Sequence, residues 1–528
     1  MKLKRVHIIS TNSCDGLLKG LDVRFPDRSS DFDPICLVGP NGSGKSQFLQ
    51  ATAEIFQSIL HHLDQGAERD ELNQTCQFEV EYSVYCKKQK KVMDVFVGRK
   101  MKGRSLTWDF KINSKGHYEI ISGEYLVEFQ LYPSAIIGYT SGGNETLSAP
   151  FYVSRAAYAE AVRQAAFDNK YMTKEVQDGR LIYIDHDTHQ EAFVANLLGN
   201  SISQLRPFLK LTNFADLLSF RIIVQLAHGA APGARSKNSK RKGVQLTMEL
   251  EAVLDYLQSC STCYLYEEET ESYTFDFLVS DATREGIDLY WQGGANDVFS
   301  TFHKLSMLND LILKRASRNK YLSNIKNGSY AAKLPRPSED DFVFRIEGIK
   351  LKSKQKKLSG DYIALSDGEH QRAQIFSMFN ILRGENILFL LDEPESHFNP
   401  KWRVEFIRAL RELMPKKKIY QDCILTTHSP FVPSDMKKEN VFVFRKDKGI
   451  LKVTHPENQT YGARFDRILE DCFEINPPIS TAAFNEIDKL MKSGSAKEIE
   501  VALEYIANSV ERAHLIHRLT KLKSEVVN

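Results

Sequence analysis

A glycine-rich segment near the start of the chain has the residue types and spacing of a phosphate-binding loop. It reads Gly39-Pro-Asn-Gly-Ser-Gly-Lys-Ser46 and lies between a short apolar run, Ile35–Val38, and an amphipathic stretch from Phe48 to Leu63. Glycines let successive backbone N–H groups point at phosphate oxygens, and the start of the following helix adds its positive dipole end. The pattern Gly-x-x-x-x-Gly-Lys-Ser in this strand–loop–helix context predicts a nucleotide site; a chance match in a glycine-rich turn is the alternative.

The residues of this loop have separate expected roles. Lys45 can bridge the β- and γ-phosphates of ATP, and the Ser46 hydroxyl is a ligand for Mg²⁺. The other nucleotide contacts are expected from the loop and the first helical turn: Gly39, Asn41, Gly42, Ser43, Gly44 and Gln47. The loop therefore implies two bound species, ATP and Mg²⁺.

Two carboxylates follow a second apolar run. Ile387–Leu391 has the composition of a central strand buried on both faces, and Asp392 and Glu393 come directly after it. Because a carboxylate is costly in a core, both side chains should face a cation or water. Asp392 suits Mg²⁺, directly or through water, and Glu393 suits activation of an attacking water as general base. The alternative is a strand followed by an acidic turn without a function. The presence of a phosphate-binding loop in the same chain makes this alternative the weaker one.

Two further segments place polar residues at the ends of expected elements. His428 follows the short apolar strand that begins at Cys423, where an imidazole could sense the γ-phosphate, although a lone histidine is more often structural. Ser366 and Gly368 lie at the start of an expected helix, which is an anion site in its own right. We therefore expect Ser366 and Gly368 to contact nucleotide and His428 to take part in catalysis.

The elements that must position these residues alternate between strand-like and helix-like patterns. Two lobes, 1–155 and 342–460, carry this alternation, and antiparallel strands are expected from about 75 to 121. Residues 156–341 have mostly helical patterning without a sustained heptad repeat, and residues 461–528 also have helical periodicity. The sequence therefore predicts an α/β fold in which two lobes flank a mostly helical insertion and C-terminal helices follow.

Taken together, these motifs resemble the ABC-type ATPase superfamily in its RecF/SMC-like branch. The matching segments are Walker A at Gly39–Ser46, the ABC signature at Leu365–Gln371, Walker B at Leu388–Glu393, the D-loop region at Ser396–Pro400 and the switch histidine at His428. The resemblance implies an ATPase head with a P-loop core sheet and an antiparallel β-subdomain. It also implies hydrolysis at a composite site, in which the signature of one head closes over the P-loop of another, and hence a homodimer or higher homo-oligomer.

The chain departs from the family pattern in two places. Asp367 and Glu369 replace Gly and Gln of the usual signature, which bears on how tightly the signature holds the γ-phosphate. The glutamine of the family's Q-loop has no clear counterpart, and Gln130 is the candidate.

The residues of two segments, one of them at Walker B, give a narrower resemblance. Leu391–Pro400 and Ile137–Glu145 are similar to the stand-alone ATPases of bacterial anti-phage systems, namely the PtuA-like ATPases of Septu and retron systems and restriction-associated ATPases. That resemblance implies a sensor or regulator of a separate effector nuclease, for which an HNH-type enzyme is one candidate. A RecF-like ATPase acting directly on DNA in repair is the alternative, and the long insertion argues against a transporter subunit.

Composition adds few constraints on partners. The 528 residues carry a net charge of +2, which selects neither nucleic acid nor membrane. No stretch approaches the ~18 apolar residues of a membrane span, and the first residues are too briefly apolar for a signal sequence. Eight scattered cysteines are typical of reduced thiols. We expect a cytoplasmic protein without membrane contact.

Three weaker signals have structural alternatives. Five cations within 235–242 could contact nucleic acid, and a solvated loop is at least as good an interpretation. Asp185, Asp187 and His189 could be ligands of a hidden nuclease metal, although a polar helix start is favoured. The Cys260–Cys263 pair lacks a second pair for zinc and is better explained as two turn or core thiols.

Overall fold

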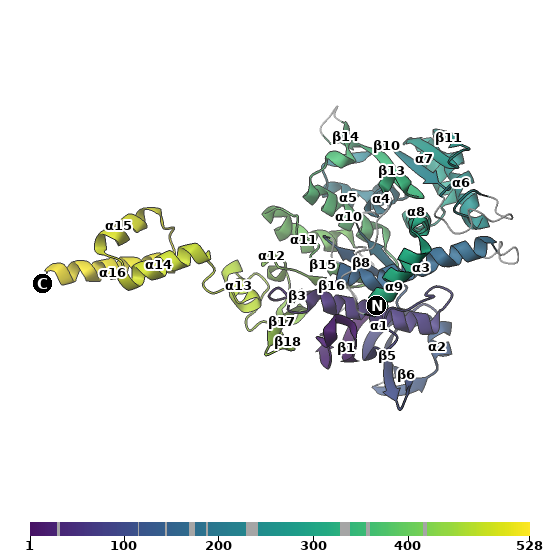
Figure 1. The fold of residues 1–528 in the computed structure, drawn as a ribbon. Helices are drawn as coiled ribbons and strands as arrows, with labels where there is room; N and C mark the ends of the chain where they lie inside the picture. Colours follow the sequence, from purple (N-terminus) through teal and green to yellow (C-terminus); the bar gives the residue numbers. More distant parts are fainter. Residues whose placement is uncertain are drawn as a thin grey trace. The chain divides into compact units, whose positions relative to one another are not determined.

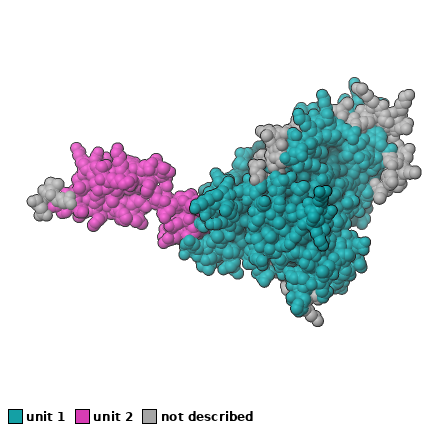
Figure 2. All heavy atoms as spheres, turned by 60° about the horizontal axis from the view of Figure 1, so that its bottom comes forward, with its two compact units in different colours: residues 1–462 teal, residues 463–528 magenta. Residues whose placement is uncertain are grey.

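The computed structural model of the protein divides into two compact units, Met1–Gly462 and Ala463–Asn528, which are coloured separately in Figure 2. The first unit contains every segment that the sequence connects with nucleotide. The structure describes residues 1–28, 32–114, 116–142, 145–167, 175–185, 188–228, 241–327, 338–354, 359–414 and 420–527.

A seven-stranded sheet forms the centre of the first unit, with the strand order β18-β17-β3-β16-β15-β8-β9 (Figure 1). All neighbours pair in parallel except β17 and β18. Its strands are β3 Ile35–Val38, β8 Ala135–Thr140, β9 Leu181–Ile184, β15 Ile387–Asp392, β16 Asp422–Thr426, β17 Val441–Asp447 and β18 Ile450–Thr454. Every residue of β3, β15 and β16 is buried, which explains why their sequences are apolar runs without alternation.

Helices cover both faces of this sheet. Helix α1, Lys45–Leu63, packs its apolar side into one core with Leu388 and Leu390 of β15. On the other face of β15, Phe389 stacks on Phe379 of α10, Asp367–Ile381, with ring centroids 4.4 Å apart. Helix α11, Pro400–Leu413, and the short α12, Phe431–Ser434, follow β15 and β16. The parallel strands are thus held between layers, and their carboxyl ends meet at one edge.

A six-stranded antiparallel sheet packs on the other side of α1. Its order is β2-β1-β4-β5-β6-β7, and its inner side chains share the core of α1. The strands are β1 Lys2–Ser10, β2 Leu21–Arg24, β4 Gln77–Cys86, β5 Lys91–Lys102, β6 Ser105–Ser114 and β7 His117–Ile121. The short helix α2, Gly123–Glu128, comes next.

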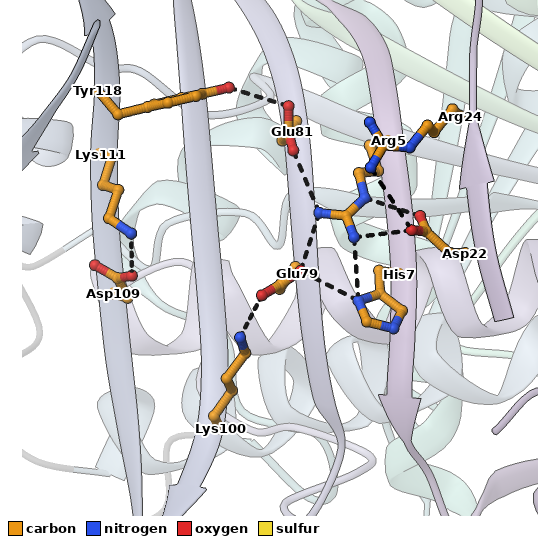
Figure 3. A network of polar contacts seen from close by, with 10 residues as sticks. All are labelled: Arg5, His7, Asp22, Arg24, Glu79, Glu81, Lys100, Asp109, Lys111 and Tyr118. Atoms are coloured by element: carbon orange, nitrogen blue, oxygen red, sulfur yellow. Dashed lines mark hydrogen bonds and ion pairs between the residues drawn. The ribbon is translucent and has the colours of Figure 1, made fainter. Parts of the chain in front are cut away.

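The outer face of this sheet carries charges that pair with one another (Figure 3). Arg5 donates to both oxygens of Asp22, at 2.8 Å each, and to Glu79 at 2.9 Å. Glu79 also accepts from Lys100, and Lys111 pairs with Asp109 at 2.6 Å. Each Arg and Lys side chain drawn in Figure 3 thus has an ion-pair partner among the Asp and Glu side chains drawn with it.

Helices predominate over strands in the described part of residues 156–341, but the same region also contributes β9 to the central sheet and further strands to a five-stranded antiparallel sheet, which the sequence did not lead us to expect. The sheet order is β11-β12-β10-β13-β14. Its strands are β10 Phe214–Gln225, β11 Cys263–Glu267, β12 Ser272–Leu278, β13 Phe344–Ser353 and β14 Ser359–Asp361. The helices are α3 Glu145–Phe167, α4 His189–Gly199, α5 Ile202–Lys210, α6 Met248–Cys260, α7 Asp281–Tyr290, α8 Ala295–Met307 and α9 Arg315–Lys326.

The second unit is helical, as its periodicity predicted. It consists of α13 Phe465–Phe473, α14 Thr481–Ser493, α15 Ala496–Tyr505 and α16 Val510–Val527. Ile487, Ile499 and Leu515 form its small buried core. Across the described ranges of both units, no helix combines the length and apolar character needed to cross a membrane.

Candidate nucleotide-binding site

The glycine-rich loop connects β3 to α1 at the carboxyl edge of the central sheet. At Gly39, where φ is 134°, an added Cβ would lie 2.2 Å from the carbonyl oxygen of Phe444, so only glycine fits. Gly44 caps α1 in the left-handed conformation, with φ of 95°, and supplies no side chain to the first-turn N–H groups. No acidic residue occupies that first turn. The helix start is therefore left as a set of N–H donors suited to an anion.

Lys45 is the first residue of α1 and is buried. Its Nζ donates to the carbonyl oxygens of Gly39 at 2.9 Å and Pro40 at 3.0 Å. Burial lowers the pKa of Lys45 to about 8, although Glu393 and Asp392 nearby oppose that shift. The ammonium is thus poorly solvated and would gain from an incoming phosphate charge.

Asp392 joins the loop to the end of β15. Its Oδ1 accepts a hydrogen bond from the Ser46 hydroxyl at 2.9 Å and another from the Thr426 hydroxyl at 2.6 Å. Thr426 ends β16, the parallel neighbour of β15. Sequence reasoning missed this residue; a threonine at the end of a buried strand, two positions before His428, was the available signal. The three side chains present hydroxyl and carboxylate oxygens together, a donor set that fits Mg²⁺.

Glu393 and His428 lie side by side next to this cluster. Glu393 has φ of 49°, and its N–H donates to the Thr426 hydroxyl oxygen at 3.0 Å. His428 Nε2 is 3.4 Å from Glu393 Oε1. Burial and the Asp392 carboxylate raise the pKa of Glu393, against the effect of Lys45. Burial and Lys45 lower the pKa of His428, against the effect of Asp392. His428 can thus hold the Glu393 carboxylate, a proton acceptor, in place beside the loop.

A cavity of about 1070 Å³ adjoins the loop. Gly42 and Gln47 line it on the loop side, and Gln50 continues the lining along α1. The opposite walls come from residues 16–17 and 19–22, Thr146, and parts of β17 and β18. Asn41 and Gly42 are exposed, whereas Ser43 is buried. A nucleoside attached to phosphates on the loop could be housed in this cavity.

The segment that resembles the ABC signature, which includes Ser366 and Gly368, forms the start of α10. Ser366 caps α10 in a capping box with Glu369, whose Oε2 accepts from the Ser366 hydroxyl at 2.9 Å. A Cβ at Gly368 would be 2.7 Å from the carbonyl oxygen of His397, so α10 and the segment after Glu393 pack tightly there. Ser366 is exposed. Among the described residues, no hydrogen bond or ion pair joins Ser366 or Gly368 to the Gly39–Ser46 loop.

Gln130 does not reach the site, so the Q-loop candidate is wrong. It sits in a turn after α2, where its N–H donates to the Val127 carbonyl at 3.1 Å. That turn precedes the amino end of β8, whereas the loop lies at the carboxyl ends of the parallel strands. The two ends of a strand face opposite edges of the sheet.

The weaker signals have ordinary structural roles where the structure describes them. Asp185 Oδ1 accepts from the Thr188 N–H at 3.0 Å, and His189 is buried against the Tyr362 ring, while Asp187 lies outside the described residues. No group of His, Cys, Asp and Glu with metal-binding geometry occurs in the described part of the chain, and Cys260 and Cys263 are free thiols.

The basic run is only partly described. Residues 235–240 lie outside the described residues. Arg241 donates to Glu251 at 2.8 Å, and Lys242 Nζ donates to the Glu268 carbonyl at 2.7 Å. These two cations are therefore engaged within the chain.

Comparison with known proteins finds similarity over parts of the chain. Residues 303–435 match the family described as "AAA domain, putative AbiEii toxin, Type IV TA system". Protein ea59 of Escherichia phage lambda is 28% identical over 166 residues, which are 30% of this chain and 30% of that protein. Septu protein PtuA of Bacillus thuringiensis is 26% identical over 143 residues, which are 26% of this chain and 35% of that protein. The chain thus spans about a third of the length of these relatives.

The solved structures that align with the chain include two heads of SMC proteins. The SMC head bound to the C-winged helix domain of ScpA aligns with a TM-score of 0.33 at 13% identity, covering 86% of this chain and 97% of that one. The SMC head domain from Thermotoga maritima aligns with a TM-score of 0.32 at 11% identity, covering 87% and 100%. Parts of the chain are thus similar to a family described as an AAA domain and to Septu protein PtuA, and the same chain carries the Gly39–Ser46 loop and the carboxylates beside it.

Proposed function

We propose that the chain binds ATP with Mg²⁺ at the Gly39–Ser46 loop, hydrolyses it, and thereby regulates a separate effector nuclease in anti-phage defence. The observation that carries the proposal is the hydrogen-bonded cluster of Ser46, Asp392 and Thr426 beside a helix start that has no side-chain cap. Oxygen ligands for a divalent cation and N–H donors for phosphate meet there at the carboxyl edge of the sheet.

In the proposed mechanism, the α1 N–H groups and Lys45 bind the β- and γ-phosphates. Lys45 Nζ would exchange its present acceptors, the carbonyls of Gly39 and Pro40, for phosphate oxygens. Ser46 and Asp392 would hold Mg²⁺, which when bound neutralises charge that develops on the phosphates. Thr426 keeps Asp392 oriented through its 2.6 Å hydrogen bond.

Glu393 is the proposed general base for the attacking water. Its raised pKa makes the carboxylate a better proton acceptor near neutral pH than an exposed glutamate. His428 at 3.4 Å can orient Glu393, and its lowered pKa favours the neutral imidazole. The Thr426 contact fixes the Glu393 backbone, so the base is positioned by the same strand end that holds Asp392.

We further propose that two copies share each site, with Ser366 and Gly368 of one facing the nucleotide of the other. The exposed Ser366 at the start of α10 is accessible to a second copy. Closure of two heads would transmit the difference in ATP affinity between closed and open states, a few kcal/mol in typical switches. That suffices to release or expose a bound effector.

The face of the six-stranded sheet drawn in Figure 3 gives little support for direct action on DNA. Cations on the outer face of the six-stranded sheet are matched by Asp22, Glu79, Glu81 and Asp109 (Figure 3). Binding to a phosphate backbone draws on unpaired cations, which release counterions. We therefore prefer control of a partner to a RecF-like role.

Defence should require both this chain and its genomic neighbours. Cells carrying the chain with its neighbouring genes are expected to resist phage, and cells carrying the chain alone are not. Lys45→Ala within the full set should remove resistance, because the phosphates lose their main counter-ion. Plaque counts on the three strains provide the measurement. Full protection by the chain alone, or DNA cleavage by the purified chain, would contradict the proposal.

ATP affinity should depend on pH through Lys45. In the free protein its pKa is about 8, and bound phosphates should raise that pKa because they favour the charged ammonium. ATP affinity is therefore at its full value well below pH 8, where Lys45 is already charged. It falls as the pH rises above 8, because Lys45 must then take up a proton to bind phosphate. The Kd is expected to increase about tenfold between pH 7 and pH 9. Lys45→Arg, which stays charged, is the matched control and should give a flat profile. A flat wild-type profile would rule out this titration.

A further inference from the structure

Strand β11 is an exposed edge of the five-stranded sheet. All five of its residues, Cys263–Glu267, are exposed, and three consecutive ones are large and apolar or aromatic. Tyr264 is 50% exposed, Leu265 67% and Tyr266 41%. Among the described residues, β11 pairs only with β12, and Figure 1 shows it at the periphery of the first unit.

An exposed edge strand of this kind can pair with a further strand. The outer side of an edge strand presents unpaired N–H and C=O groups, and proteins usually protect these groups with charge, proline or a bulge. Within β11 the pairing to β12 runs in regular register from Cys263 with Asp276 to Glu267 with Ser272, without a bulge. Its central positions carry no charge and no proline. A regular, apolar edge of this kind is suited to pairing with another strand.

The local sequence favours a second copy of this chain as that strand. Tyr264 and Tyr266 flank Leu265 symmetrically, so the centre of β11 reads the same in both directions. An antiparallel pair centred on Leu265 would place each Tyr264 opposite a Tyr266 of the other copy. A two-fold interface needs this kind of self-complementarity, and aromatic cross-strand pairs stabilise it.

Charge fixes the direction of that pairing. The turn after β11 is acidic, with Glu267, Glu268, Glu269 and Glu271. A parallel pair of two copies would bring these glutamates side by side, which is unfavourable. The antiparallel pair puts the two acidic turns at opposite ends and sets Glu267 against Cys263. We propose that two copies join through antiparallel β11 strands into a continuous ten-stranded sheet, independently of nucleotide.

Sedimentation velocity without nucleotide tests the interface. The wild-type chain should dimerise, and Leu265→Lys should weaken self-association at least about tenfold because two charges would face each other at the symmetry axis. Ile120→Lys is the matched control: Ile120 is 79% exposed on β7, the edge strand of the other antiparallel sheet, and its replacement should change nothing. Thermal melts should show that both variants are folded.

Cysteine cross-linking tests the register on a separate variant. Glu267→Cys should form interchain disulfides with the native Cys263 of the second copy under mild oxidation. Wild type should not cross-link through Cys263, because the two Cys263 residues would be four positions out of register. Adding Cys263→Ser to Glu267→Cys should abolish the cross-link.

Two results would overturn the proposal. One is a wild-type chain that stays monomeric up to roughly 100 µM, which would leave the edge to a strand of a different protein. The other is a Glu267→Cys chain that cross-links equally well in the Cys263→Ser background. Because neither assay uses ATP, their outcome is separate from that of the ATPase proposal.

Discussion

Glu393→Gln is expected to stop ATP turnover while leaving ATP binding intact. The change keeps the size of the side chain and the hydrogen bond from the Glu393 N–H to Thr426, and it removes only the proton acceptor. Turnover should fall about 10²- to 10⁴-fold, the usual contribution of a general base. ATP should then accumulate on the protein together with the closed dimer. Phosphate release measures the turnover, and the ATP that stays with the protein through size-exclusion chromatography measures its accumulation.

Lys45→Ala separates binding from chemistry in the same assays. It should lower ATP affinity about 100-fold, since a charge-assisted contact to phosphate is lost. No ATP-dependent dimer should form.

A Glu393→Gln protein that hydrolyses ATP at the wild-type rate would show that the base is a different residue.

Mixing two inactive variants should restore activity. Ser366→Arg blocks the signature and Lys45→Ala disables the loop, so each variant alone has no complete site. In a mixed dimer, the loop of the Ser366→Arg subunit meets the intact signature of the Lys45→Ala subunit. An equal mixture should reach about a quarter of the wild-type rate, because half the dimers are mixed and each has one intact site.

The control for this experiment is subunit exchange. Differently labelled variants should show energy transfer after mixing, which establishes that mixed dimers exist. Exchange without any gain in ATPase rate above the two parents would contradict a site shared between subunits.

The central strands and the phosphate loop could be predicted because their signals are local. Ile35–Val38 and Ile387–Asp392 are buried on both faces, so composition alone marks them. The loop glycines are dictated by backbone geometry at their own positions, as the contact of Gly39 with Phe444 illustrates. No knowledge of the rest of the chain is needed for either inference.

The remaining features depend on pairing between distant segments. Thr426 meets Asp392 only because Leu391 pairs with Leu425, a register that neither strand specifies by itself. Gln130 precedes the amino end of β8, and the sequence around it does not specify the pairing of β8 with β15 that puts the loop at the other end of these strands.

Strand β10 was missed for a different reason. Register shifts interrupt its pairing with β13 between Phe214 and Arg221. Its buried residues Phe214, Leu217 and Phe220 are therefore spaced by three rather than two. Such irregular pairing lets a strand imitate a helical period.

The left-handed backbone of Glu393 has a consequence for how this protein can be engineered. A non-glycine residue at φ of 49° costs ~1 kcal/mol of folding free energy, and glycine would not bear that cost. Selection for heat resistance alone would therefore tend to replace Glu393 with glycine and discard the proposed catalytic base. A search for more heat-stable variants must therefore keep Glu393 unchanged, or measure ATP turnover alongside melting temperature.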